Sequence, residues 1–151
     1  MTNAPPFSSL SLPAATLANL TQLGYVTMTP IQAASLPLGL AGHDLIAQAK
    51  TGSGKTAAFA LVLLAKLEPK RALGVQALVL CPTRELADQV AHEIRRIARA
   101  EENIKILTLC GGTPIRPQLA SLEHGAHVIV GTPGRVLDHL SRGTLKLDAL
   151  N

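Results

Sequence analysis

The stretch Ala49-Lys50-Thr51-Gly52-Ser53-Gly54-Lys55-Thr56 decides the fold that this sequence predicts. It follows the apolar run Asp44-Leu-Ile-Ala-Gln48 and precedes a helix-forming run that begins at Ala57. The order of strand, glycine-rich turn, Gly-Lys-Thr and helix is typical of a phosphate-binding loop. Glycines at two positions let the backbone curl, so that successive N–H groups and the helix N-terminus face one anion.

Two side chains of this loop have predicted roles in nucleotide chemistry. Lys55 would neutralise the β- and γ-phosphates, and Thr56 would offer its hydroxyl to Mg²⁺. We therefore expect the loop from Ala49 to Thr56 to bind a nucleotide, with Lys55 and Thr56 as the catalytic residues and Thr56 as the metal ligand. Ala49 stands where the usual pattern has glycine, so the motif taken alone is weaker than a full match.

The composition indicates an aliphatic core in a domain of ordinary size. The chain has 151 residues, of which 47% are hydrophobic, and its three aromatic residues are Phe7, Tyr25 and Phe59. A core of Leu, Val, Ile and Ala is typical of buried parallel strands covered by helices. The formal net charge of +4 favours polyanionic partners without identifying one.

Cysteine usage and apolar runs favour a cytoplasmic protein without a membrane partner. Cys81 and Cys110 are the two cysteines, which we expect to be buried free thiols rather than a disulfide framework or a zinc site. The N-terminus lacks the basic and apolar regions of a secretory signal. The longest apolar run, Ala57 to Ala65, is far shorter than the ~20 residues that span a bilayer.

From Leu45 onward the predicted elements alternate between strand and helix. Such repetition predicts an α/β fold with a parallel, doubly wound sheet and ligands at the carboxyl ends of its strands. The expected strands are Leu45–Ala49, Ala77–Cys81, Ile104–Cys110 and Val128–Val130. The expected helices are Pro13–Leu23, Pro30–Leu40, Lys55–Leu67, Arg84–Arg99, Pro117–Glu123 and Gly134–Leu140.

Three short strings follow predicted strands at that carboxyl edge. They are Pro82-Thr83-Arg84, Gly111-Gly112 and Thr132-Pro133-Gly134-Arg135. Small hydroxyl residues, helix N-termini and arginines suit the phosphates of an extended polyanion. The alternative for each string is a capped helix with a surface arginine. No aromatic residue lies near these strings to stack on bases, which predicts contact through phosphate and sugar.

The segment Gly24-Tyr25-Val-Thr-Met-Thr-Pro30-Ile31-Gln32 predicts a base-recognition site. A glutamine amide offers a donor and an acceptor side by side, which matches adenine and not guanine. Tyr25 could stack on the base. Two structural alternatives stay open, because Thr29-x-x-Gln32 also reads as a capping box and Tyr25 could simply pack.

These strings together resemble motifs of the DEAD-box ATP-dependent RNA helicases. Gly24–Gln32, with Phe7 seventeen positions before Gly24, resembles the Q motif. Pro82-Thr-Arg-Glu-Leu-Ala87 resembles motif Ia, Gly111-Gly112 the GG element, and Thr132–Arg135 motif Ib. The resemblance runs from Phe7 to about Asn151. It implies a RecA-like P-loop domain that uses ATP and Mg²⁺, with Phe7, Tyr25 and Gln32 joining the loop 49–56 at the nucleotide.

The resemblance also sets expectations for the organisation of the chain. Residues 1–6 would form a flexible tail, 7–43 the Q-motif region, and 44–151 a RecA-like domain 1 that is incomplete at its C-terminus. The Asp-Glu-Ala-Asp string is expected just after Asn151, and a second RecA-like domain further on. We therefore expect an N-terminal fragment that is inactive alone.

The implied parent is a monomeric RNA helicase that holds the backbone of single-stranded RNA. A C-terminal domain absent from this chain would choose the RNA, with ribosomal RNA and hence ribosome biogenesis as one candidate. A competing reading is a P-loop kinase or metabolic ATPase acting on a small molecule. That reading fits residues 44–68 and leaves the other strings unexplained. A non-catalytic interaction module is a third reading.

Overall fold

The computed structural model describes residues 4–70 and 74–151. The chain divides into two compact units. The helical unit comprises the residues up to Lys66 together with Glu93–Glu101, and the sheet unit comprises Leu67–His92 and Glu102–Asn151. The elements in chain order are η1 (Phe7–Ser9), α1 (Ala14–Gln22), α2 (Pro30–Leu40), α3 (Lys55–Lys66), β1 (Ala77–Leu80), α4 (Arg84–Ile97), η2 (Ala98–Ala100), β2 (Ile106–Leu109), α5 (Arg116–Glu123), β3 (Val128–Gly131) and α6 (Pro133–Ser141).

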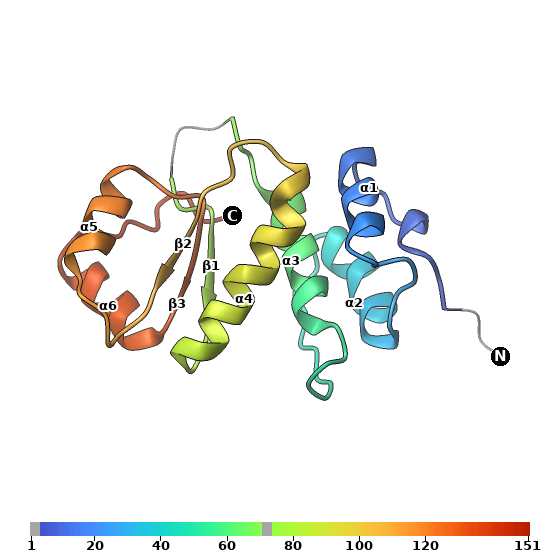
Figure 1. The fold of residues 1–151 in the computed structure, drawn as a ribbon, viewed down its shortest axis with the longest axis horizontal. Helices are drawn as coiled ribbons and strands as arrows, with labels where there is room; N and C mark the ends of the chain where they lie inside the picture. The colour runs from blue at the N-terminus through green and yellow to red at the C-terminus, as the bar shows by residue number, and fades with distance from the viewer. Residues whose placement is uncertain (1–3, 71–73) are drawn as a thin grey trace. The chain divides into compact units, whose positions relative to one another are not determined.

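The sheet unit is built on three parallel strands in the order β1-β3-β2 (Figure 1). Gly131, at the end of the central strand, pairs with Leu80 on one side and Leu109 on the other. The carboxyl ends of all three strands therefore finish level with one another. This register brings the loops that follow the strands to the same edge of the sheet.

Helices cover both faces of this sheet. Ile129 and Leu109 pack with Val136 of α6 and Leu122 of α5 in one core cluster. Successive side chains of a strand alternate between faces, so Val128 and Val130 lie on the opposite face, which the first part of α4 covers (Figure 1). The predicted α/β fold with a doubly wound parallel sheet is confirmed for these three strands.

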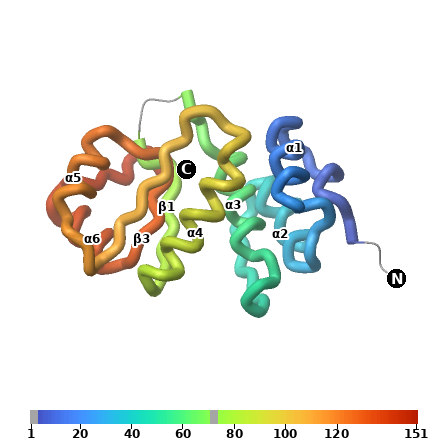
Figure 2. The backbone as a smooth tube through the Cα atoms, in the orientation of Figure 1, coloured from blue at the N-terminus to red at the C-terminus, as the bar shows by residue number. Residues whose placement is uncertain are grey.

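In the helical unit, α2 begins at Pro30 as the sequence predicts, and α1 ends at Gln22, one residue before the predicted end at Leu23. Gly24 follows α1 with φ of +86°, which suits glycine at this position. Thr29 caps α2, and Pro30 is its first residue. Helices α2 and α3 approach closely at Gly39, where a Cβ atom would lie 2.6 Å from Val62 Cγ2. The chain path through these helices can be followed in Figure 2.

The N-terminal tail predicted over residues 1–6 is only partly within the described residues. Residues 1–3 lie outside them. Pro6 forms an antiparallel bridge with Thr27, and Met28 N donates to Pro5 O at 2.8 Å. The proline rings hold this segment extended, so its carbonyls can accept hydrogen bonds. Pro5 and Pro6 thus belong to the folded chain rather than to a flexible tail.

The strand predicted over Leu45–Ala49 is wrong for this structure. The segment carries no strand assignment, and Ile46 is fully exposed at 104%. A parallel strand exists only where a neighbour accepts and donates its backbone hydrogen bonds. No strand in residues 4–70 or 74–151 pairs with this segment, although its composition is that of a buried strand.

Candidate functional site

The predicted phosphate-binding loop lies between the unpaired segment and α3. Gly52 and Gly54 have φ values of +79° and +89°, a left-handed conformation that favours glycine. Lys55 Nζ folds back across the loop and donates to Ala49 O and, at 3.0 Å, to Lys50 O. The loop therefore wraps around an ammonium group in this structure.

The donor set of the loop fits a phosphate group. Ser53 Oγ is buried and has no hydrogen-bond partner among the described residues. An unpaired buried hydroxyl costs free energy, which a bound phosphate oxygen would recover. Thr56 lies in the first turn of α3, at the helix end that favours anions. Among the described residues, no group of three His, Cys, Asp or Glu side chains could hold a metal ion.

Gln32 is bound to the backbone of this loop. Its Nε2 donates to Gly54 O at 3.1 Å, and its Oε1 accepts from Thr29 N at 2.9 Å. The Thr29 hydroxyl donates to Ser53 O at 2.8 Å. A Cβ atom on Gly54 would lie 2.4 Å from Gln32 Nε2, so the contact is closely fitted. We call these four residues the Gln32 clamp.

The capping-box alternative for Gln32 is present in the structure. The capping box occupies only part of the hydrogen-bonding capacity of the Gln32 amide, because the amide carries two N–H groups and two acceptor positions. One donor and one acceptor remain after the contacts with Gly54 and Thr29. The side chain is only 1% exposed, so a base reaches these atoms only after the covering atoms move.

Tyr25 packs on protein and is only half-buried. Its ring meets Phe7 edge to face with centroids 6.1 Å apart, and its hydroxyl donates to Glu93 Oε1. Glu93 Oε2 accepts from Arg96 at 2.8 Å. The packing alternative therefore describes Tyr25 here, and Phe7 is buried beneath it. Of these two rings, only Tyr25 is exposed enough to meet a ligand without rearrangement.

Tyr25 provides a spectroscopic test of this arrangement. Burial, followed by the hydrogen bond to Glu93 and its charge, raises the pKa of Tyr25 to about 12. Because the folded-state pKa is raised, the stabilisation is complete below pH ~10 and is lost as the pH rises toward 12. Tyr25 is the only tyrosine and tryptophan is absent, so absorbance near 295 nm reports this residue alone.

We expect the absorbance titration of the folded chain to have its midpoint near pH 12. Glu93→Gln should lower that midpoint, because it removes the negative charge while an amide oxygen still accepts the hydrogen bond. Circular dichroism at each pH checks that the chain remains folded. A folded wild-type chain that titrates at the pH of free tyrosine would contradict the Tyr25–Glu93 contact.

In the sheet unit, the three predicted polyanion strings come together at the carboxyl edge. Gly111 N donates to Thr132 Oγ1 at 3.3 Å, which joins the loop after β2 to the loop after β3. A Cβ atom on Gly112 would lie 3.3 Å from Arg84 Nη1, so the arginine after β1 lies against the same loop. Pro82, Pro133 and Gly134 are exposed beside them.

The helix-capping alternative holds for Thr83 and does not hold for Thr132. Thr83 Oγ1 accepts from Leu86 N at 3.2 Å and so caps α4. Thr132 makes no side-chain cap on α6, because its hydroxyl accepts from Gly111 instead. Both helices nevertheless begin at this edge with free N–H groups.

Sequence reasoning missed two residues at this edge, Gln118 of α5 and His139 of α6. Gln118 Oε1 lies 3.0 Å from Arg135 Nη1 and 2.8 Å from His139 Nε2. Arg135 also donates to Thr113 O at 3.0 Å. The available signal was the spacing of Arg135 and His139, four residues apart and hence on one helix face.

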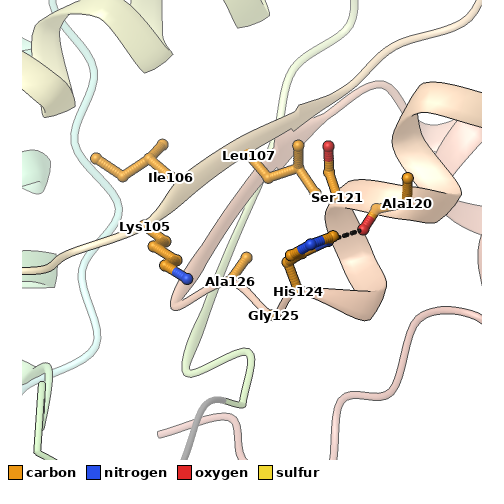
Figure 3. A pocket seen from close by; sticks show the side chains of 8 residues that line it. All are labelled: Lys105, Ile106, Leu107, Ala120, Ser121, His124, Gly125 and Ala126. Atoms are coloured by element: carbon orange, nitrogen blue, oxygen red, sulfur yellow. Dashed lines mark hydrogen bonds between the residues drawn. The ribbon is translucent and has the colours of Figure 1, made fainter.

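Neither the cavity beside β2 and α5 nor the two cysteines belong to the predicted site. A pocket of about 350 Å³ opens between β2 and α5 (Figure 3). It lies at the amino ends of the strands, and its imidazole, His124, is bonded to its own helix at Ala120 O. Cys81 and Cys110 are buried free thiols, as predicted, and burial raises the pKa of both.

No helix in residues 4–70 and 74–151 has the length and hydropathy needed to cross a bilayer.

Comparison with known proteins identifies the family. The model of the DEAD/DEAH box helicase family matches residues 29–151, which is most of the chain. The chain belongs to the DEAD/DEAH box helicase family. The matched range of this DEAD-box chain includes Thr29–Gln32 of the segment that resembles the Q motif, the predicted phosphate-binding loop 49–56 and all three strings of the carboxyl edge. The family predicted from those motifs is confirmed.

Relatives and solved structures agree with this assignment. The DEAD-box chain is 64% identical to the ATP-dependent RNA helicase DbpA of Escherichia coli K12, over 96% of its own length and 32% of that protein. The stretches Val26–Met28, Leu86–Val90 and Leu107–Gly112 predict this likeness to DbpA. A DEAD box protein from Methanococcus jannaschii is 42% identical with a TM-score of 0.90, over 97% of this chain and 39% of that one.

A third comparison is with a ligand-bound structure. Saccharomyces cerevisiae Dbp5 bound to RNA and ADP–BeF₃ is 32% identical with a TM-score of 0.86, over 98% of this chain and 37% of that one. The DEAD-box chain thus spans about a third of the length of the relatives that it matches.

Proposed function

We propose that this chain supplies the nucleotide-binding loop and the RNA-contacting edge of an ATP-dependent RNA helicase. The observation that carries the proposal is the meeting of the loops after β1, β2 and β3 at one edge of the sheet. A P-loop kinase or metabolic ATPase would use the loop 49–56 and would have no need of that edge. The RNA-bound state of Dbp5, which shares this fold, supports the choice.

On the nucleotide side, the loop 49–56 holds phosphates and Gln32 holds the base. Lys55 leaves its contacts with Ala49 O and Lys50 O when phosphates enter, and its charge then neutralises them. Ser53 Oγ and the loop N–H groups bind phosphate oxygens. Thr56 is the residue that would hold Mg²⁺, and the ion would supply positive charge that offsets the negative charge of the phosphates.

Gln32 has two tasks in this proposal. Its contact with Gly54 O keeps the loop curled. Its second donor and second acceptor read the adenine edge once the covering atoms move, and Tyr25 lies on the same Q-motif segment to pack against the base. The two tasks can be distinguished by comparing nucleotides. Loss of the loop contact should weaken the binding of every nucleotide, whereas loss of the base contact should weaken only the binding of adenine nucleotides.

On the RNA side, the carboxyl edge binds phosphate and sugar. Arg84, Arg135 and the N-termini of α4 and α6 provide positive charge along the edge, and Gly111 and Gly112 allow close approach of the backbone. The edge has no aromatic residue for stacking. We infer sequence-independent contact with a single strand.

The catalytic cycle of the whole protein needs groups beyond these residues. Hydrolysis needs a carboxylate for Mg²⁺ and a group that orients the attacking water. The sequence contains no Asp-Glu pair. We propose that a DEAD segment and a second RecA-like domain supply these groups, and that ATP-driven closure of the two domains bends and separates RNA strands. The whole protein would act as a monomer in the cytoplasm.

Nucleotide selectivity tests the nucleotide half of this proposal. We expect Gln32→Ala to weaken ATP and ADP binding more than GTP binding, because only adenine loses the two amide contacts. The selective loss should be on the order of 1–3 kcal/mol. Fluorescence competition with ATP, ADP and GTP measures it, and Gln22→Ala, an exposed glutamine of α1, is the matched control.

Loss of ATP and GTP binding by equal factors would show that Gln32 acts only through the loop. That result would support the contact of Gln32 with the loop and would contradict the recognition of adenine by Gln32. If Gln32→Ala weakens the binding of no nucleotide, Gln32 serves only as part of the cap of α2.

A further inference from the structure

A buried polar network lies beneath the Thr132–Arg135 loop. Gln118 is 8% exposed and His139 is 0% exposed. Besides Arg135 and His139, Gln118 contacts Cys110 O at 3.1 Å and Thr113 Oγ1 at 3.2 Å through Nε2. One amide thus joins α6 to the loop that contains Gly111 and Gly112. The proposed function assigns roles to the exposed residues at this edge and none to these two.

The orientation of the Gln118 amide is fixed by its neighbours. An arginine guanidinium only donates hydrogen bonds, and a backbone carbonyl only accepts them. The oxygen of Gln118 must therefore face Arg135, and the nitrogen must face Cys110 O. The same oxygen faces His139 Nε2 at 2.8 Å, so that imidazole nitrogen carries a hydrogen.

His139 is held on its other side as well. Its Nδ1 lies 2.9 Å from Thr144 Oγ1, just beyond the end of α6. Burial, with the charge of Arg135 as a second cause, lowers the pKa of His139, which keeps the imidazole neutral. A neutral imidazole with its hydrogen on Nε2 donates to Gln118, and its Nδ1 faces the Thr144 hydroxyl, which also lies 3.1 Å from His139 O. Gln118 is thereby prevented from turning away from Arg135.

Arg135 is consequently fixed at two points. Nη1 donates to Gln118 and Nη2 donates to Thr113 O. A guanidinium has five N–H groups, so three remain for a ligand. The Arg135 side chain is half-buried. Its hydrogen bonds to Gln118 and Thr113 O keep the guanidinium from rotating, so its three remaining N–H groups have fixed directions.

We propose that Gln118 and His139 are positioning residues that hold the Arg135 guanidinium in place for an RNA phosphate. This inference rests on the proposed function, which makes Arg135 a phosphate contact. Arginines free to move lose side-chain entropy when they bind, and an arginine fixed beforehand does not. The network also ties the position of Arg135 to the Gly111-Gly112 loop, so that adjacent phosphates meet both together.

Salt-dependent RNA binding tests the positioning role, with a short oligouridylate as the probe. We expect Gln118→Ala to weaken binding roughly tenfold, because Arg135 loses a hydrogen bond to a buried acceptor. The log–log salt slope should flatten by about 0.7, the value for one lost phosphate contact on a single strand. Arg135→Ala should give the same flattening, and the double variant no further flattening. Ser121→Ala, exposed on the same helix, is the control.

Gln118→Met keeps the length of the side chain and removes both polar atoms, so it serves if the alanine variant does not fold. The same flattening is expected for it. An unchanged slope in the folded Gln118 variants, together with a flattened slope in Arg135→Ala, would overturn the positioning role and leave the proposed function standing. Unchanged slopes in both Arg135→Ala and Arg84→Ala would overturn the proposed RNA edge itself.

Discussion

Replacing Gly54 by alanine should abolish most of the ATP affinity of this chain. The left-handed φ of +89° at Gly54 strains any residue with a Cβ atom. The new Cβ would also lie 2.4 Å from Gln32 Nε2 and 3.2 Å from Thr29 Oγ1. Gln32 is buried, so it can yield only by breaking its bond to Gly54 O. Strain and the lost bond together cost about 2–3 kcal/mol, a loss of roughly 30- to 150-fold in binding.

Gly52→Ala separates the two causes of that loss. Gly52 has a similar φ of +79°, and a Cβ there would meet nothing within 4 Å. It should therefore lose ATP affinity through strain alone, by a smaller factor than Gly54→Ala. Fluorescence titration of both variants gives the difference, which measures the Gln32 clamp. Equal losses in the two variants would show that the clamp contributes nothing to nucleotide binding.

Gly131→Ala should destabilise the sheet unit more than any other single glycine replacement within it. Gly131 ends the central strand, and its new Cβ would lie 2.6 Å from Leu109 O and 2.7 Å from Val136 Cγ2. Leu109 O belongs to the backbone of a neighbouring strand and also accepts from Thr132 N at 3.0 Å, so it cannot move aside. Such overpacking should cost about 2–3 kcal/mol of unfolding free energy, measured by urea denaturation.

The matched control lies three residues further along the chain. Gly134 is in the first turn of α6, where a Cβ would meet nothing within 4 Å. Gly134→Ala should leave stability unchanged or raise it by up to about 1 kcal/mol, because alanine favours a helix. We therefore expect Gly131→Ala to lower the free energy of unfolding and Gly134→Ala to leave it unchanged or raise it. Equal stability of Gly131→Ala and the wild-type chain would contradict the close approach of β3 to Leu109.

Local signals predicted most of the fold. Gly24 and Gly143 end helices with φ of +86° and +69°, and Thr29-Pro30 begins one, because these residues act within a few positions of themselves. Apolar runs that alternate with predicted helices located β1, β2 and β3 to within two residues. The strand over Leu45–Ala49 failed because strand formation depends on a partner, which composition alone does not supply.

For the candidate site too, local features were predicted from the sequence and contacts between distant segments were not. The three strings of the carboxyl edge were predicted to lie at one edge because each follows a predicted strand, and the structure brings them together. The sequence could not show that Lys55 lies across its own loop or that Tyr25 donates to Glu93, because those contacts join segments through the fold. Gln118 was missed for the same reason, as its role depends on the side chains of α6 and on the carbonyl of Cys110.

RNA-stimulated ATP hydrolysis tests the central claim most directly. We propose that this chain binds nucleotide and RNA, and that groups outside it carry out hydrolysis, because its sequence has no Asp-Glu pair. We predict no stimulated phosphate release from the 151-residue chain, and stimulated release when a DEAD segment and a second RecA-like domain follow it. Lys55→Ala in that longer protein should remove the activity. Phosphate release by the 151-residue chain on addition of RNA would contradict the account.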